Sequence, residues 1–196
     1  MRCVIFASAI CFFLSPVALA QDATPQPPPI VPLDQATFDQ GAAAFDAGRY
    51  ADAYNIFTNL SERGDIAATR NVALMLRKGL GVEKDPVKAM EVYERAADAG
   101  LSTAQADLGE MYLNGEGGAP DVRAAAHYLG LAAAAGHPIA QFHMGWLYEN
   151  GTGVPKNMDL ATKLYQASAE AGDKDAKARL AALGLPELPE LRGQTP

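Results

Sequence analysis

Apolar residues recur along the middle of the chain at intervals of three and four positions, the spacing of one face of an α-helix. Three stretches show it in the same order: Val72, Met75 and Leu76; Leu108, Met111 and Tyr112; Met144, Leu147 and Tyr148. A second run follows each stretch, for example Ala89, Val92, Tyr93 and Ala97. The pattern predicts pairs of amphipathic helices.

The paired pattern repeats with a period of 36 residues. Small residues occupy equivalent positions in three copies without a gap: Ala68, Ala104 and Ala140; Gly79, Gly115 and Gly151; Gly81, Gly117 and Gly153; Ala89, Ala125 and Ala161; Ala97, Ala133 and Ala169; Gly100, Gly136 and Gly172. Ala176 continues the first series. Agreement of six positions in three copies indicates tandem structural repeats.

Turn and cap residues divide each copy into two helices. The first glycine pair ends the first helix, because glycine adopts left-handed backbone angles readily. Asp85, Asp121 and Asn157 are N-cap residues for the second helix, and Pro86 fits its first position. The Gly151-Thr152-Gly153 turn therefore belongs to the repeat, and no Lys-Ser/Thr pair follows it as in a phosphate-binding loop.

The repeat resembles the Sel1-like repeat of the tetratricopeptide-repeat superfamily. Its pattern is carried in one copy by Ala140, Met144, Gly145, Tyr148, Gly151, Gly153, Val154, Asn157, Ala161, Tyr165, Ala169 and Gly172. The resemblance implies an all-α fold, a right-handed superhelical α-solenoid of antiparallel helix pairs. It divides residues 35–183 into a tetratricopeptide-like repeat at 35–66, Sel1-like repeats at 68–103, 104–139 and 140–175, and a capping helix at 176–183.

Both ends of the chain differ from the repeats. Residues 1–20 have the basic start, short apolar run and small-x-small ending of a secretory signal peptide, so we expect cleavage after Ala20 and a periplasmic or secreted protein. Cys3 and Cys11 lie within it, which leaves the mature chain without a thiol. Residues 21–34 are a proline-rich linker and residues 184–196 a proline-rich tail, both of which we expect to be extended.

Charge and chemistry exclude several classes of function. The formal net charge is −7, and removal of Arg2 with the signal makes it −8, so nucleic-acid binding and stable membrane insertion are not expected. His127, His137 and His143 lack metal-ligand spacing. We find no matched acid and base and no nucleophile motif. The sequence therefore predicts a monomeric protein that is not an enzyme and holds no metal or cofactor.

The candidate partner surface consists of the first-helix positions that packing does not need. Counted from Ala68, Ala104 and Ala140, offsets 0, 4, 5 and 8 should face inward, whereas offsets 3, 6 and 10 share one helical face along the concave side. The latter are Asn71, Leu74, Lys78, Asp107, Glu110, Asn114, His143, Trp146 and Asn150. Trp146 stands out, because tryptophan is enriched at binding hot spots. Alternatively, its ring covers a neighbouring helix.

The preferred interpretation is a periplasmic scaffold or regulator that binds an envelope protein or an extended peptide in its concave groove. Protein–protein binding is what the family resemblance implies. Asp107 and Glu110 would select a basic partner segment. The alternative is a protein that binds or hydrolyses cell-wall material, peptidoglycan or a β-lactam, supported by the location and by the pairing of Trp146 with His143. A chaperone for secreted proteins is a third possibility.

Overall fold

The computed structural model describes residues 37–185, and all regular structure in that range is helical. The expected signal peptide, the linker and all but the first two residues of the expected tail lie outside it. The helices, in chain order, are α1 (Phe38–Asp46), α2 (Tyr50–Glu62), α3 (Ile66–Lys78), α4 (Pro86–Asp98), α5 (Ser102–Asn114), α6 (Val122–Ala134), α7 (Pro138–Asn150), α8 (Met158–Glu170) and α9 (Lys174–Ala182). None of these helices combines the length and apolarity needed to cross a membrane.

The helix ends lie where the cap residues predict them. Gly79, Gly115 and Gly151 end α3, α5 and α7 in the left-handed conformation, with φ values of 72°, 68° and 69°. The side chains of Asp85, Asp121 and Asn157 accept hydrogen bonds from the first backbone amides of α4, α6 and α8. These interactions satisfy backbone groups that a helix end otherwise leaves exposed, so the boundaries follow from single residues.

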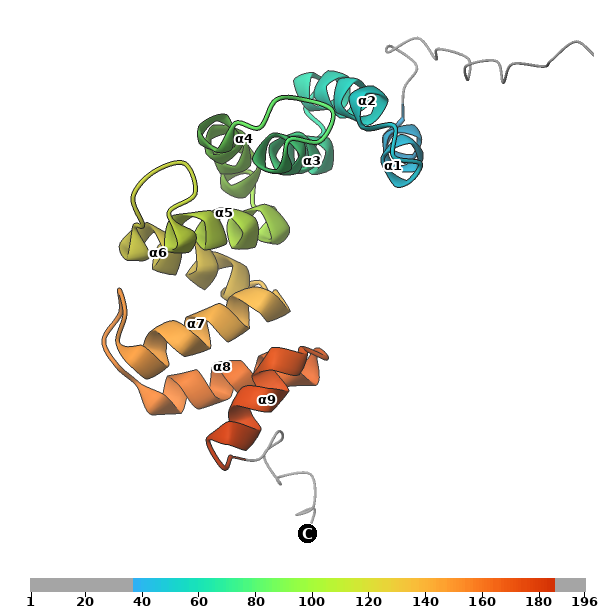
Figure 1. Ribbon diagram of the computed structural model, residues 1–196. Helices are drawn as coiled ribbons and strands as arrows, with labels where there is room; N and C mark the ends of the chain where they lie inside the picture. Colours follow the sequence, from blue (N-terminus) through green and yellow to red (C-terminus); the bar gives the residue numbers. More distant parts are fainter. Residues whose placement is uncertain (1–36, 186–196) are drawn as a thin grey trace, which may run out of the picture. The chain divides into compact units, whose positions relative to one another are not determined.

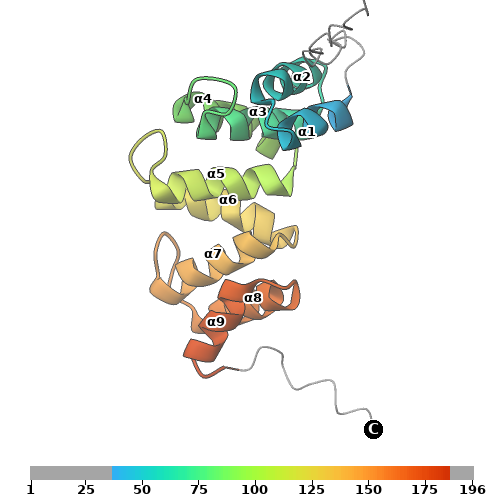
Figure 2. The same ribbon diagram turned by 45° about the vertical axis from the view of Figure 1, so that its right-hand side comes forward.

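The helices pack in chain order. The main contacts between helices all join neighbours in the sequence, from α1 with α2 to α8 with α9. Figures 1 and 2 show the same succession from two directions, with α1 in blue and α9 in red. Such nearest-neighbour packing defines an α-solenoid, and the predicted all-α solenoid is confirmed.

The buried residues form a series of clusters along the stack. Ala68, Ala104, Ala140 and Ala176, at the start of successive first helices, are each 0% exposed. Most of the first-helix positions expected to face inward are buried. The exceptions are Tyr112 and Tyr148, which are only partly buried.

The first and last helices close the ends of the described stack. In α1 and α2, which form the expected tetratricopeptide-like repeat, the buried residues are small, aromatic or apolar: Gly41, Ala44, Ala53, Phe57 and Leu60. At the other end, α9 begins at Lys174, two residues before the expected start of the capping helix. Its buried residues, Ala176 and Leu180, face the rest of the stack, whereas Lys174 and Lys177 are exposed.

Close helix packing predicts opposite effects for alanine at two helical glycines. A Cβ at Gly109 of α5 would lie 2.6 Å from Leu129 Cγ, whereas a Cβ at Gly130 of α6 has no neighbour within 4 Å. We expect Gly109→Ala to lower the free energy of unfolding by about 1–3 kcal/mol through overpacking. Gly130→Ala should raise it by about 0.5–1 kcal/mol through helix propensity. Urea unfolding followed by circular dichroism measures both, and equal effects would contradict this packing.

Candidate partner-binding surface

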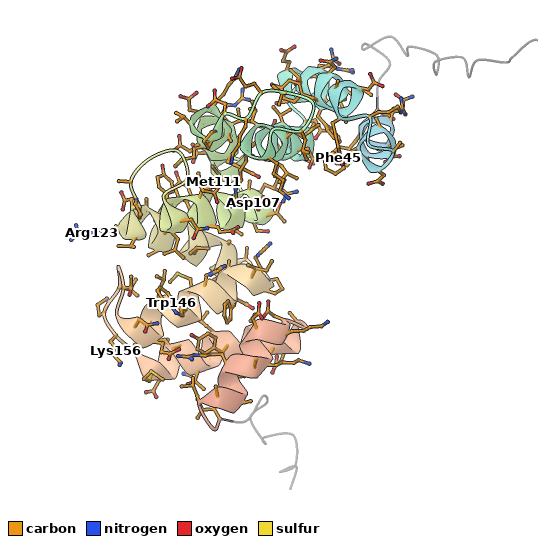
Figure 3. All side chains as sticks on the ribbon, viewed as in Figure 1. Phe45, Asp107, Met111, Arg123, Trp146 and Lys156 are labelled. Carbon is orange, nitrogen blue, oxygen red and sulfur yellow. The ribbon has the colours of Figure 1, made fainter. Side chains whose placement is uncertain are left out.

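The nine predicted site residues lie on α3, α5 and α7, the first helices of the three repeats. Lys78, Asn114, Trp146 and Asn150 are exposed, and the other five are half-buried. Figure 3 labels Asp107 on α5 and Trp146 on α7. None of the nine is fully buried, so all contribute to the surface.

Four of the nine residues line one groove between α3 and α5. The groove has a volume of about 630 Å³. Its lining comprises the predicted residues Leu74, Lys78, Asp107 and Glu110, together with Arg70, Arg77, Lys84 and Glu116, which the sequence analysis did not select. The predicted residues of α7 do not line it. The structure therefore brings four of the six predicted residues of α3 and α5 together in a single polar groove.

Two arginines of α3 form ion pairs with the carboxylates of this groove. Arg70 Nε donates a hydrogen bond to Asp107 Oδ2 at 2.7 Å, and Arg70 Nη2 lies 2.7 Å from the same oxygen in a salt bridge. Arg77 donates from Nε and Nη2 to the two oxygens of Glu116, at 2.7 and 2.5 Å. A longer contact of 3.4 Å joins Arg77 Nη1 to Glu110 Oε2. These bonds hold α3 against α5 and its following loop.

The arginine pairs change the charge that a partner meets. Hydrogen bonds from Arg77 lower the pKa of Glu116, and burial opposes them less strongly. Asp107 and Glu110, expected to select a basic segment, already have cationic partners within the chain. Lys78 and Lys84, by contrast, form no salt bridge within the described residues. The free charges at this groove are therefore cationic.

The sequence contained a signal for the missed arginines. Arg70 has Ala106 and Phe142 as counterparts in the other repeats, and Arg77 has Leu113 and Glu149. Residues that depart from the repeat at a fixed position are not required by the packing. The same comparison that selected Trp146 would have selected both arginines, had it been applied to offsets 2 and 9.

A second polar network joins α7, α8 and α9. Glu149 is 9% exposed. Its Oε2 accepts a hydrogen bond from Tyr165 Oη at 2.7 Å and one from Arg179 Nε at 2.9 Å, and Arg179 Nη2 donates to Oε1. The Arg179 hydrogen bond is the main cause of the lowered pKa of Glu149, and burial opposes it. This buried carboxylate ties the capping helix to the preceding repeat.

The predicted residues on α7 differ in exposure and in their contacts. Trp146 is 39% exposed, and its carbonyl oxygen accepts a hydrogen bond from Asn150 Nδ2 at 2.8 Å. His143 is half-buried against Phe142, and burial lowers its pKa, although Glu110, Asp173 and Asp175 act in the opposite direction. The indole of Trp146 therefore offers an exposed apolar surface one helical turn from the half-buried His143.

The other histidines do not join this surface. His137 caps α7, with Nδ1 accepting from Ala140 N at 3.4 Å, and burial lowers its pKa. His127 is exposed on α6. Among residues 37–185, no group of three or more His, Cys, Asp or Glu side chains is placed to hold a metal ion.

Comparison with known proteins identifies the class. Sel1 repeats match residues 66–101, 102–137 and 138–173, more than half of the chain, and the chain belongs to the Sel1 repeat family. The match has the predicted 36-residue period, with boundaries two residues earlier than the sequence analysis placed them. Sel1 repeats generally form scaffolds for protein–protein interaction.

Solved structures agree on the fold. A Sel1 repeat protein from Oxalobacter formigenes is 33% identical, with a TM-score of 0.70 over 78% of this chain and 64% of its own. A protective antigen of uropathogenic Escherichia coli is 24% identical, with a TM-score of 0.66 over 76% and 36%. Cysteine rich protein B of Helicobacter pylori is 19% identical, with a TM-score of 0.52 over 74% and 98%. The chain thus spans less than two thirds of the first two. No curated protein matches significantly.

The buried carboxylate predicts a pH-dependent stability. Because the pKa of Glu149 is lowered in the folded protein, its stabilisation is present above the ordinary carboxyl pKa, about 4.3, and is lost as the pH falls through the lowered value. We expect Glu149→Gln to lower the free energy of unfolding by about 2 kcal/mol at pH 7, because Arg179 loses its charged partner. The difference from the wild type should shrink below about pH 4.

Urea unfolding at pH 7 and pH 3 measures this difference, and hydrogen exchange in α9 locates it. Glu170→Gln, at an exposed position of α8, is the matched control and should change neither. A Glu149→Gln defect of the same size at both pH values would show that shape, and not charge, stabilises this network.

Proposed function

We propose that this protein is a non-enzymatic scaffold or regulator that binds another protein, or an extended peptide, along the surface formed by α3, α5 and α7. The observation that carries the proposal is the placement of the nine predicted residues. They occupy equivalent positions on three successive first helices, all reach the surface, and four line a groove of about 630 Å³.

The energetics of this surface suit recognition. The helices are ordered before binding, so association loses little conformational entropy in the protein. The arginine–carboxylate pairs between α3 and α5 fix the polar side chains in place. Trp146 supplies an exposed aromatic anchor of the kind that dominates many interfaces. No specific observation favours the alternative of a protein that binds or hydrolyses cell-wall material.

The proposed location is the periplasm or the exterior, with an envelope protein as the partner. Support comes from the sequence of residues 1–20, which has the features of a cleavable signal. The first test of this location is therefore to determine which residue begins the mature protein.

Expression of the full chain in a bacterial host should give a mature protein that begins at Gln21. Intact-mass measurement of protein from the periplasmic fraction detects removal of residues 1–20. Ala20→Arg changes the residue before the cleavage point and should leave the signal attached. Recovery of the whole chain in the cytoplasmic fraction would contradict the proposed location.

Loss of the exposed indole should weaken partner binding. Mature protein, immobilised and exposed to an envelope extract of the native host, should capture a specific partner. We expect Trp146→Ala to reduce affinity for the isolated partner by roughly thirtyfold, equivalent to about 2 kcal/mol. Because this is the only tryptophan, its fluorescence reports partner binding directly.

The matched control is Val87→Ala, which truncates a side chain that is 54% exposed on α4, away from the proposed surface. It should leave the affinity unchanged. If the partner binds the Trp146 variant normally but loses affinity for the Val87 variant, the interface lies on the second helices of the repeats and the proposed surface is wrong.

A further inference from the structure

A buried tyrosine hydroxyl beside the α3–α5 groove has no acceptor for its proton. Tyr93 of α4 is 0% exposed, and no group within the described residues accepts a hydrogen bond from its Oη. The charged groups that act on it are Asp107, Arg70 and Arg77, and all three line the groove. Burial, the largest influence, raises its pKa, so the hydroxyl keeps its proton. The Tyr93 hydroxyl is therefore a buried hydrogen-bond donor beside the groove lining, and no group in the described residues accepts its hydrogen bond.

The third repeat shows what the equivalent tyrosine does when its network is complete. Tyr165 stands 72 residues after Tyr93, at the same position of the repeat, and its hydroxyl donates to the carboxylate of Glu149. Arg179 supplies the neutralising charge from the next first helix. Donor, acceptor and counter-ion are all present in that network.

In the first repeat the charges are reversed. Arg77 occupies the position of Glu149, and Asp107 occupies the position of Arg179. A guanidinium can only donate hydrogen bonds, whereas a carboxylate accepts them. Arg77 thus cannot take the proton of the Tyr93 hydroxyl, and both Asp107 and Glu116 already accept from arginines. The reversed charges therefore leave the Tyr93 hydroxyl without the kind of acceptor that Glu149 provides for Tyr165.

The free charges of the groove are also donors. Lys78, at the end of α3, and Lys84, in the following turn, line it and are exposed. Four cationic and three anionic side chains surround the groove, so it carries a surplus of positive charge in a chain whose formal net charge is −7. From Arg70 to Lys78 the lining extends roughly 12 Å along α3, enough for an extended segment of three or four residues.

We propose that the α3–α5 groove binds the carboxylate of an acidic side chain in an extended partner segment, with the Tyr93 hydroxyl and the ammonium groups of Lys78 and Lys84 as its donors. The inference rests on the proposed function and names the chemistry of its partner. Arg77 keeps its two bonds to Glu116 and gives up its longer contact, 3.4 Å to Glu110, to admit the carboxylate. The sequence had suggested a basic segment, whose charge would have to compete with Arg70 and Arg77 for the carboxylates of the groove.

Three synthetic peptides test the inference. They share one extended sequence, Ser-Leu-Ser-X-Ser-Leu-Ser, acetylated and amidated so that X carries the only charge, with X as Glu, Gln or Lys. Isothermal titration at low salt should give an affinity for the Glu peptide at least tenfold above that for the Gln peptide. The Lys peptide should bind more weakly than the Gln peptide.

Variants of the lining separate binding from folding. Tyr93→Phe removes a buried hydroxyl that has no acceptor, so it should keep or raise the thermal midpoint while it weakens binding of the Glu peptide about tenfold. Lys78→Gln combined with Lys84→Gln should weaken binding by a similar factor and reduce its salt dependence. Tyr165→Phe is the matched control, and it should lower the thermal midpoint without changing the affinity.

Equal affinity for the Glu and Gln peptides overturns the inference, as does no measurable binding of the Glu peptide at millimolar concentration. A Tyr93→Phe variant that loses stability but keeps its affinity shows a purely structural tyrosine and also overturns it. The proposed function fails by a different result, normal partner capture by Trp146→Ala. Equal binding of all three peptides, lost in Trp146→Ala, would leave the surface in place and remove the carboxylate site.

Discussion

The close approach of the two helices in each pair is the constraint on which the structure depends. A small residue on the first helix faces a bulky one on the second. A Cβ on Gly41, Gly109 or Gly145 would lie 2.6–2.7 Å from a side-chain carbon of the second helix. The partners are Phe57, Leu129 and Tyr165. Because the bulky side chain fills the space that a Cβ would take, the distance between the helices is set by this contact.

The same contact decides what lies at the surface between successive repeats. The side chain that packs over the small residue points past it, toward the gap between one first helix and the next. Its tip therefore meets the residue at offset 9. The two positions hold Arg77 and Tyr93, Leu113 and Leu129, and Glu149 and Tyr165 in the three repeats. A polar tip is paired with a polar residue in the first and third repeats, and an apolar tip with an apolar residue in the second. Of the two tyrosine hydroxyls, only that of Tyr165 has an acceptor within the described residues.

Much of the fold was predictable because it depends on local rules. Helix ends follow from glycines that adopt left-handed angles and from caps such as Asp85 and Asn157. The inward positions follow from the repeat, since the alanines that recur in every copy, at Ala68, Ala89, Ala97 and their equivalents, are all buried. Partial burial of Tyr112 was not predictable, because its hydroxyl reaches the surface to donate to Glu94 at 2.8 Å.

The candidate surface was predictable only as a set of positions. Its chemistry depends on contacts between residues 33–39 apart, such as Arg77 with Glu110 and Glu116. Spacing within a helix says nothing about which long side chain reaches across to the next one. For that reason the sequence assigned Asp107 and Glu110 a free negative charge, although both carry arginine partners.

The contacts between successive first helices, α3 with α5, α5 with α7 and α7 with α9, therefore differ in chemistry. Ion pairs join α3 to α5, and a buried carboxylate joins α7 to α9. Between α5 and α7, no salt bridge is formed in the described part of the chain, and the positions equivalent to the ionic ones hold Ala106 and Leu113. We propose that a partner meets a fixed polar pattern at α3 and α5 and the exposed indole of Trp146 at α7. Because a rigid polar pattern rejects mismatched groups more strongly than an apolar surface does, such a partner would gain selectivity from the first contact and affinity from the second.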